Sequence, residues 1–134
     1  MILVDTSVWI EILRDKKGQI VRLFRERLGD DIYALTRFTQ LELLQGARDD
    51  NEWNMLDDYL STQYYLEATE STWKEAARTY FELRRQGTTI NSTVDCCIAQ
   101  IAIETGALLL HRDEDFSRIA RIRHLAAERF DPQT

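Results

Sequence analysis

The sequence has little of what would place a chain outside the ordinary globular proteins. Its 134 residues include one Pro and five Gly, which excludes collagen-like and low-complexity chains. Its apolar runs stay well short of the roughly 18 residues that suggest a membrane span. The N-terminal segment lacks the basic region of a signal peptide, and Asp5 interrupts its apolar stretch. We therefore expect a cytoplasmic protein with a single domain, residues 1–134.

Cysteine is also scarce. The two cysteines, Cys96 and Cys97, are adjacent, which excludes a disulfide framework because neighbouring residues of one helix suit disulfide geometry poorly. The chain has no Cys-x-x-Cys pair of the kind found in zinc and redox sites. We expect both cysteines to serve as apolar filler of the core.

Positive charge is in deficit, with 17 basic residues against 23 acidic ones and a net charge of −6. Nucleic-acid binding through a general excess of positive charge is therefore not indicated. Three of the basic residues are Lys and the other 14 are Arg, the side chain that pairs bidentately with phosphate. This preference indicates either codon usage or anion binding, and the acidic excess leaves carboxylates available to hold a metal.

Short apolar runs alternate with segments of helical spacing along the chain. The runs that predict strands are 1–4, 32–35, 64–67, 107–110 and, near the C-terminal end, 122–125. The segments that predict helices are 8–13, 20–28, 38–47, 49–62, 71–85, 94–105 and a short one ending at 120. Strands this apolar leave no face for solvent, so the pattern predicts an α/β fold in which helices cover both faces of a parallel sheet.

Two local features of the predicted helices bear on the site. Thr6 and Ser7, which follow Asp5, are the expected N-caps of the first helix. The helix after the second strand is predicted to bury an apolar face made of Phe38, Leu41, Leu44 and Ala47. Glu42 lies off that face.

Acidic residues follow the predicted strands at the points where a parallel sheet binds its ligands, outside the carboxyl ends of the strands. Asp5 ends the first strand, and Asp113 follows the fourth strand, with Asp115 two residues on. Glu42 lies on the helix after the second strand, and Asp95 lies in the first turn of the helix over 94–105. We predict that acids from these four segments converge on one cleft.

Converging carboxylates raise one another's pKa, so such a cleft holds protons or a cation. Oxygen ligands favour Mg²⁺ or Mn²⁺, and a site of this kind supports attack of water on a phosphodiester without a Ser or His nucleophile. Each acid alone has an ordinary explanation. Asp5 ends a strand, Glu42 faces solvent, Asp95 complements a helix dipole, and Asp113 or Asp115 caps a helix, so only the constellation carries the argument.

Four motifs together resemble the PIN-domain ribonucleases of the VapC toxin type. They are LVDTSVWI at 3–10, ELLQGA at 42–47, Val-Asp followed by Ile-Ala at 94–99, and LHRDEDF at 110–116. Their order and spacing match the family, and the resemblance covers nearly the whole chain, being weakest over 49–86.

The resemblance implies a three-layer α/β/α sandwich with a central parallel sheet of four to five strands. It implies a Mg²⁺- or Mn²⁺-dependent endoribonuclease, usually the toxin of a toxin–antitoxin pair, that inhibits translation by cutting structured RNA such as tRNA or rRNA loops. It also implies a homodimer or a toxin–antitoxin hetero-oligomer. In the latter, a VapB-type antitoxin blocks the cleft with its C-terminal segment, and an Arg of that segment would pair with the acidic site.

The resemblance also implies roles for individual residues. The catalytic and metal-binding acids would be Asp5, Glu42, Asp95 and Asp113. Thr6 would orient Asp5 through a hydroxyl hydrogen bond, and Asp115 is the alternative to Asp113 as the fourth acid. Arginines at the edges would hold the RNA backbone, with Arg22, Arg25, Arg27, Arg84, Arg85 and Arg112 as candidates, although each alone also fits a solvated helix face.

Other families that place Asp at strand ends fit less well. A receiver-like phosphoacceptor usually needs a late Lys, and the last Lys is Lys74. A haloacid-dehalogenase-type phosphatase needs a second Asp where Ser7 stands. A non-catalytic nucleic-acid-binding α/β domain would tolerate loss of the acids, yet all four are present. Some PIN domains cut DNA structures, which the acids alone do not exclude.

Overall fold

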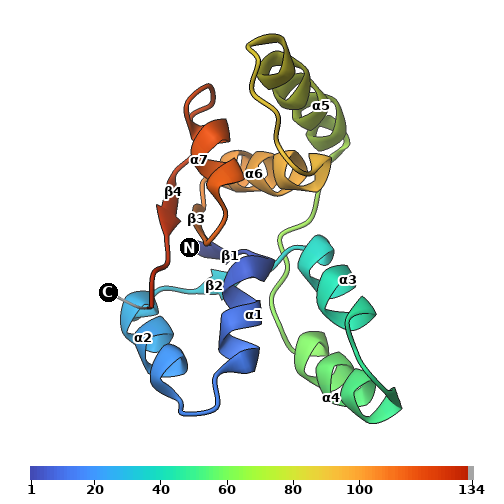
Figure 1. Cartoon of the computed structure of the whole chain (residues 1–134), viewed down its shortest axis with the longest axis vertical. Coiled ribbons are helices and arrows are strands. Elements are labelled where there is room, and N and C mark those ends of the chain that lie inside the picture. Colours follow the sequence, from blue (N-terminus) through green and yellow to red (C-terminus); the bar gives the residue numbers. More distant parts are fainter. Residues whose placement is uncertain (133–134) are drawn as a thin grey trace.

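The computed structural model describes residues 1–132, which form seven helices and four strands (Figure 1). The first half comprises β1 (Ile2–Val4), α1 (Thr6–Arg14), α2 (Gln19–Leu28), β2 (Tyr33–Ala34), α3 (Arg37–Gln45) and α4 (Asp50–Ser61). The second half comprises α5 (Glu70–Arg85), α6 (Thr93–Thr105), β3 (Leu108–His111), α7 (Glu114–Ala120) and β4 (Ala127–Arg129). Within the described residues, no helix has the length and apolar character to cross a membrane.

The strands form one parallel sheet in the order β2-β1-β3-β4. In the register, Leu3 of β1 is level with Ala34 of β2 on one side and Leu109 of β3 on the other. The predicted parallel sheet of four to five strands is therefore confirmed. Because all strands run the same way, the residues that follow β1 and β3 emerge at the same edge.

Alternate residues of β1 point to opposite faces of the sheet, as the strand geometry requires. Leu3 belongs to a buried cluster with Ile98 and other residues of α5, α6 and α7. Val4 belongs to a second cluster with Trp9 and other residues of α1, α2 and α4. Figure 1 shows these two groups of helices on opposite sides of the sheet. The chain is a three-layer α/β/α sandwich, as predicted.

Capping residues set the ends of the helices next to the site. The predicted capping of α1 by Thr6 or Ser7 is wrong, because Asp5 is the N-cap and accepts a hydrogen bond from the Ser7 N–H. An Asp that leaves a strand in extended conformation already has the backbone geometry of an N-cap. Ser92 caps α6, and Gly106 ends it at φ +71°.

Two predicted strands do not form. The segment 64–67 makes a single bridge, in which Leu35 N donates to Tyr64 O (2.9 Å) and Leu66 N to Leu35 O (2.8 Å). The chain then leaves the sheet to begin α5. The segment 122–125 is a turn, closed by Leu125 N to the Arg123 carbonyl at 2.8 Å. The last strand, β4, follows this turn. It lies at the sheet edge and is less apolar, so the hydrophobic pattern did not predict it.

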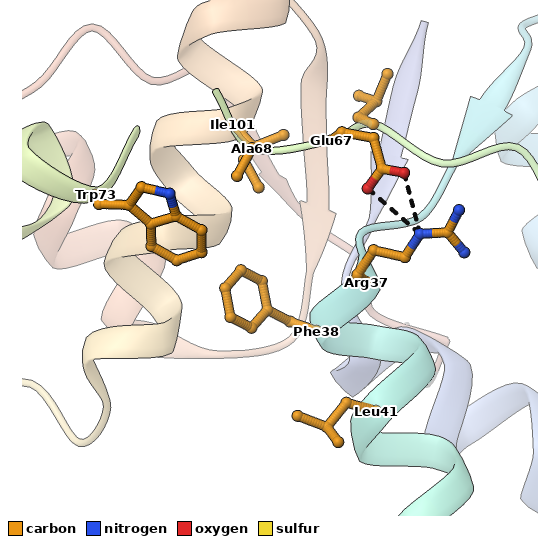
Figure 2. A pocket seen from close by; sticks show the side chains of 8 residues that line it. Arg37, Phe38, Leu41, Glu67, Ala68, Trp73 and Ile101 are labelled. Atoms are coloured by element: carbon orange, nitrogen blue, oxygen red, sulfur yellow. Dashed lines mark hydrogen bonds and ion pairs between the residues drawn. The ribbon is translucent and has the colours of Figure 1, made fainter. Parts of the chain in front are cut away.

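The predicted apolar face of α3 is wrong at Leu41, which is 62% exposed. Phe38 and Leu44 are half-buried against the two core clusters, as predicted. The fully buried side chains of the helix are Thr39 and Leu43. Figure 2 shows Phe38 and Leu41 at a surface pocket of about 500 Å³, opposite Trp73 of α5. The helix instead turns a polar residue, Thr39, toward α1, because hydrogen bonds there replace apolar packing.

Candidate active site

Asp5 lies at the carboxyl end of β1 and is 5% exposed. Its Oδ2 accepts hydrogen bonds from the Ser7 backbone N–H (3.0 Å) and from the Ser7 hydroxyl (2.6 Å). Burial raises the pKa of the Asp5 carboxyl above its ordinary value; the bonds from Ser7 oppose this rise, and the charge of Glu42 adds to it. The carboxylate is therefore held in one orientation and lies close to a second acid.

Ser7 connects Asp5 to the segment that follows β3. Its Oγ accepts a hydrogen bond from the Arg112 backbone N–H at 2.9 Å while it donates to Asp5. The Arg112 guanidinium pairs with Glu11 of α1 at 2.9 Å. These contacts join α1 to the segment that carries Asp113, across 105 residues of sequence. Sequence reasoning missed this role of Ser7, although an Asp N-cap with a Ser two residues on predicts the local bond.

The predicted bond from the Thr6 hydroxyl to Asp5 does not form. Thr6 Oγ1 donates to Glu42 Oε1 at 3.0 Å and lies 2.9 Å from Thr39 Oγ1, which then donates to Thr6. Successive helix residues point about 100° apart, so Thr6 faces α3 while Ser7 faces the segment after β3. Thr6 therefore holds Glu42, and Ser7 holds Asp5.

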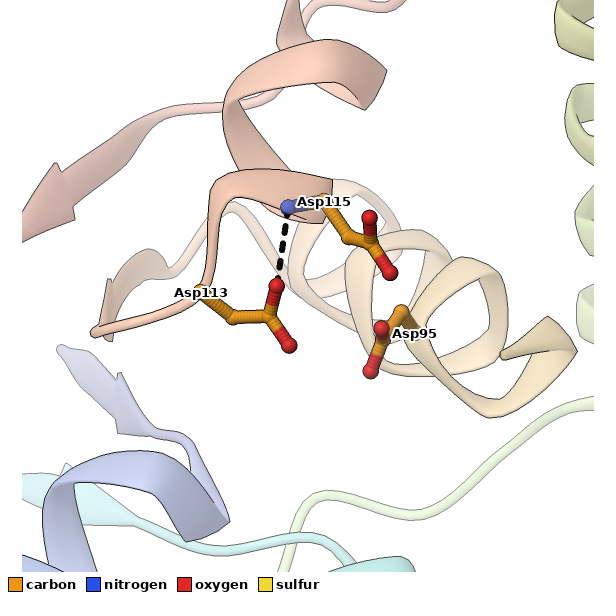
Figure 3. Close-up of side chains that lie close together, drawn as sticks. All are labelled: Asp95, Asp113 and Asp115. Carbon is orange, nitrogen blue, oxygen red and sulfur yellow. Dashed lines mark hydrogen bonds between the residues drawn. The ribbon is translucent and has the colours of Figure 1, made fainter. Parts of the chain in front are cut away.

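Three acids meet on the other side of the site. Asp95, Asp113 and Asp115 each offer an oxygen, and these oxygens lie within 4.8 Å of one another (Figure 3). Asp95 comes from the first turn of α6, and Asp113 is the N-cap of α7, where it accepts from the Asp115 N–H at 2.9 Å. The charge of Asp5 also acts on Asp95. The predicted acids of separate segments are thus neighbours at one sheet edge.

The crowding has a clear electrostatic consequence for Asp95. Its pKa is raised from 3.8 to about 8. Burial is the largest cause, followed by the hydrogen bond with Asp115 and the negative charges of Asp113 and Asp5. Asp95 therefore retains a proton near neutral pH unless a cation compensates the surrounding charge.

Asp115 differs from the other acids because both of its carboxylate oxygens already have donors, one of them a cation. It is fully buried, and it accepts from the Arg118 guanidinium (2.8 Å) and from the Asn91 N–H (2.9 Å). It thereby fixes the segment that leads into α6 and to Asp95.

His111 is a further neighbour that sequence reasoning missed. Its Nδ1 accepts the Asp113 N–H at 3.2 Å, and its ring packs on Phe116. Burial and the charge of Arg129 lower the pKa of His111, which keeps Nδ1 available as an acceptor. The sequence signal for this role is the position of His111, at the end of an apolar strand and just before an acid.

The two cysteines lie beside Asp95 as free thiols. Cys96 is buried in the core cluster and Cys97 is half-buried against it, as predicted. Burial raises the pKa of the Cys96 thiol to about 12 and also raises that of Cys97. Neither thiol carries the thiolate that oxidation or metal binding requires at neutral pH.

The donor set fits a hard divalent cation. Carboxylate oxygens are the ligands that Mg²⁺ and Mn²⁺ take, and three of them lie within 4.8 Å of one another beside Asp5. Burial and neighbouring negative charges raise the pKa of Asp95, so a cation there would stabilise its ionised form. Both oxygens of Asp115 already accept from Arg118 and Asn91, so the acids that could hold such an ion are Asp95 and Asp113, with Asp5 and Glu42 beside them.

Comparison with known proteins gives consistent results. The PIN domain family matches residues 2–122. Ribonuclease VapC11 of Mycobacterium tuberculosis is 38% identical over 134 residues, covering 97% of this chain and 99% of the relative. Ribonuclease VapC51 of the same species is 31% identical, covering 90% of this chain and 85% of the relative.

Solved structures share the fold at lower identity. VapBC2 from Rickettsia felis, bound to a DNA fragment from its promoter, contains a chain with a TM-score of 0.78 and 20% identity, covering 98% of this chain and 100% of that one. A chain of FitAcB from Neisseria gonorrhoeae has a TM-score of 0.74 and 22% identity, covering 98% of each.

Proposed function

The chain belongs to the PIN-domain family, and from this premise we propose that it is a metal-dependent endoribonuclease toxin of the VapC type. Its substrate is structured cellular RNA, such as tRNA or rRNA loops, and its cleavage inhibits translation. The relatives at 38% identity are named as VapC ribonucleases and are matched over nearly their whole length. The observation that carries the proposal is the convergence of acids from four chain segments at one sheet edge.

We assign the metal to Asp5, Glu42, Asp95 and Asp113, with Mg²⁺ as the ion and Mn²⁺ as its substitute. The chemistry that such an ion supplies when bound is a lowered pKa of bound water and neutralisation of charge on phosphate oxygens. Asp115 is assigned a positioning role in place of direct ligation, because Arg118 and the Asn91 N–H already occupy its oxygens.

The surrounding side chains keep the acids in place for this chemistry. Ser7 holds Asp5 and Thr6 holds Glu42, each through a hydroxyl that donates to the carboxylate. The imidazole of His111 accepts from the Asp113 N–H and so fixes the turn that aims Asp113. The acids thus reach their positions before RNA binds, which lowers the cost of ordering them.

The proposal includes a VapB-type antitoxin and a homodimer or toxin–antitoxin hetero-oligomer. The structural neighbour from Rickettsia felis is described as a VapBC complex. The site suits inhibition by a cationic side chain, because burial and neighbouring negative charges raise the pKa of Asp95. An Arg of a partner segment would pair bidentately with these carboxylates.

The test is incubation of the purified, antitoxin-free protein with total cellular RNA in Mg²⁺, in Mn²⁺ and in EDTA. We expect discrete cuts that need a divalent ion and that disappear in Asp5→Asn. Asp58→Asn, an exposed acid of α4, is the matched control and should cut as the unmodified protein does. Absence of cuts from folded protein, or equal cutting by Asp5→Asn, contradicts the proposal.

A further inference from the structure

The 14 arginines differ in how their charge is compensated. Seven have a carboxylate of their own: Arg22, Arg27, Arg37, Arg48, Arg112, Arg118 and Arg129. Arg78 and Arg123 share a single carboxylate, Glu82. Arg85 has no carboxylate partner among residues 1–132, and its guanidinium lies over the Phe81 ring. Arg14, Arg25, Arg84 and Arg121 likewise form no ion pair within these residues. Arg85 differs from them because it shares a surface with Arg78 and Arg123, where three guanidiniums face one carboxylate, that of Glu82.

These side chains line one surface depression of about 510 Å³ between α5 and the turn after α7. We call this surface the α5 arginine patch; its lining residues are Arg78, Phe81, Glu82, Arg85, Gln86, Ile122 and Arg123. Figure 1 shows the end of α5 and the turn that leads to β4 at the same end of the molecule.

Helical spacing arranges the patch around one aromatic ring. Arg78, Phe81 and Arg85 are three and four residues apart and therefore share a face of α5. The Arg78 and Arg85 guanidiniums lie 4.9 Å and 5.5 Å from the Phe81 ring centre. Glu82 neutralises one charge, through Arg78 at 3.1 Å and through Arg123. The remaining guanidinium N–H groups are free to meet an external anion.

We propose that the α5 arginine patch binds the phosphate backbone of the RNA a few nucleotides from the scissile bond; this inference rests on the proposed ribonuclease function. Guanidinium groups donate two parallel hydrogen bonds to a phosphate. A half-buried aromatic ring flanked by cations also offers a stacking face for a base. An acidic protein segment would use the charge but not the ring.

The position of the patch fits a strand that extends from the acidic site. Helix α7 begins beside Asp115 at the acidic cluster and ends just before the turn that carries Arg123. Its seven residues span about 10 Å at roughly 1.5 Å per residue. A stacked nucleic-acid strand rises roughly 3.4 Å per nucleotide, so the patch would meet RNA a few nucleotides from the cut.

The test compares Arg85→Glu with Arg14→Glu. Both arginines are exposed, lie in the last turn of their helix and have no carboxylate partner within residues 1–132, so the charge change is matched. Binding of a fluorescent single-stranded RNA is measured by anisotropy in EDTA, over a range of salt. We expect Arg85→Glu to weaken binding about tenfold and to reduce the slope of log K against log salt by about 0.7, the value of one phosphate contact.

Arg14→Glu should change neither quantity, and Arg85→Gln should give an intermediate loss if the effect is electrostatic. Equal binding by Arg85→Glu and Arg14→Glu would show that the patch does not bind RNA. If poly-glutamate displaces the RNA at a similar concentration, the RNA proposal is also overturned, because the patch would then bind an acidic protein. If the protein binds RNA through Arg85 but cuts none, the patch proposal holds and the ribonuclease proposal fails. If the protein cuts RNA and Arg85→Glu has no effect on binding, the ribonuclease proposal holds and the patch proposal fails.

Discussion

The acidic site has two halves that are built on different principles. The α1 half comprises Asp5 and Glu42, and each carboxylate accepts from a hydroxyl of α1, Ser7 or Thr6. The α6 half comprises Asp95, Asp113 and Asp115, whose oxygens lie within 4.8 Å of one another. Only Asp115 among them has a cationic partner, Arg118.

The two halves differ in how strongly they depend on a cation. In the α1 half, the neutral donors of Ser7 oppose the rise in the Asp5 pKa that burial and the charge of Glu42 cause. In the α6 half, burial and like charges raise the pKa of Asp95 to about 8, so a proton or a cation has to compensate them. We infer that the α1 half orients ligands while the α6 half senses the charge of the site.

The largest effect is expected from removing one carboxylate in either half. Asp5→Asn or Asp95→Asn should lower RNA cleavage more than about 100-fold, beyond the usual cost of losing a residue that only supports a ligand. Cleavage rates in Mg²⁺ beside Asp58→Asn measure this effect. If the Asp95→Asn protein still cleaves RNA, the α6 half takes no part in the reaction.

A smaller loss is expected from the hydroxyl that supports the α1 half. Ser7→Ala removes the bonds from the hydroxyl to Asp5 and from the Arg112 N–H to that hydroxyl. It should lower cleavage about 10- to 100-fold. Ser7→Thr keeps the hydroxyl and should restore most of the activity. If Ser7→Ala cleaves at the unmodified rate, the α1 half does not depend on this donor.

Stability should depend on the α6 half through Arg118. Arg118→Met leaves the buried carboxylate of Asp115 without its cation, which should cost about 3 kcal/mol in the free energy of unfolding. Arg22→Met breaks an exposed pair with Glu26 and should cost less than about 1 kcal/mol. Urea unfolding of both variants makes the comparison, and equal costs would show that Asp115 is satisfied without Arg118.

The smallest effect is the pH dependence of stability without metal. A carboxyl whose folded pKa is raised from 3.8 to about 8 stabilises the folded state at low pH, and this stabilisation is lost as the pH rises through that window. Asp95→Asn does not ionise, so in EDTA it should melt a few degrees higher than the unmodified protein at pH 8.5, with a smaller difference at pH 5. If the two proteins differ in melting temperature by the same amount at every pH in this range, the titrating charge does not belong to Asp95.

Much of this arrangement was predictable because it depends on local pattern. The apolar runs located β1 and β3, and Asp5 and Asp113 follow directly from their ends. Helical spacing located α6, and with it Asp95. Parallel strands then bring such residues to one edge whatever else the chain does.

What could not be predicted depends on contacts between distant segments. The Thr6 hydroxyl was assigned to Asp5, but the contact of α1 with α3 directs it to Glu42. The exposure of Leu41 likewise follows from Thr39 facing α1. The strand at 127–129 lies at the sheet edge and lacks the apolar pattern by which the other strands were found.

The central claim is that the α6 half holds a proton that a divalent cation replaces. Calorimetric titration with Mn²⁺ at pH 7, in two buffers that differ in ionisation enthalpy, measures the protons released per ion bound. With the Asp95 pKa at about 8, we predict release of about one proton from the unmodified protein and little from Asp95→Asn. Binding without proton release, or the same release from Asp95→Asn, would contradict the account.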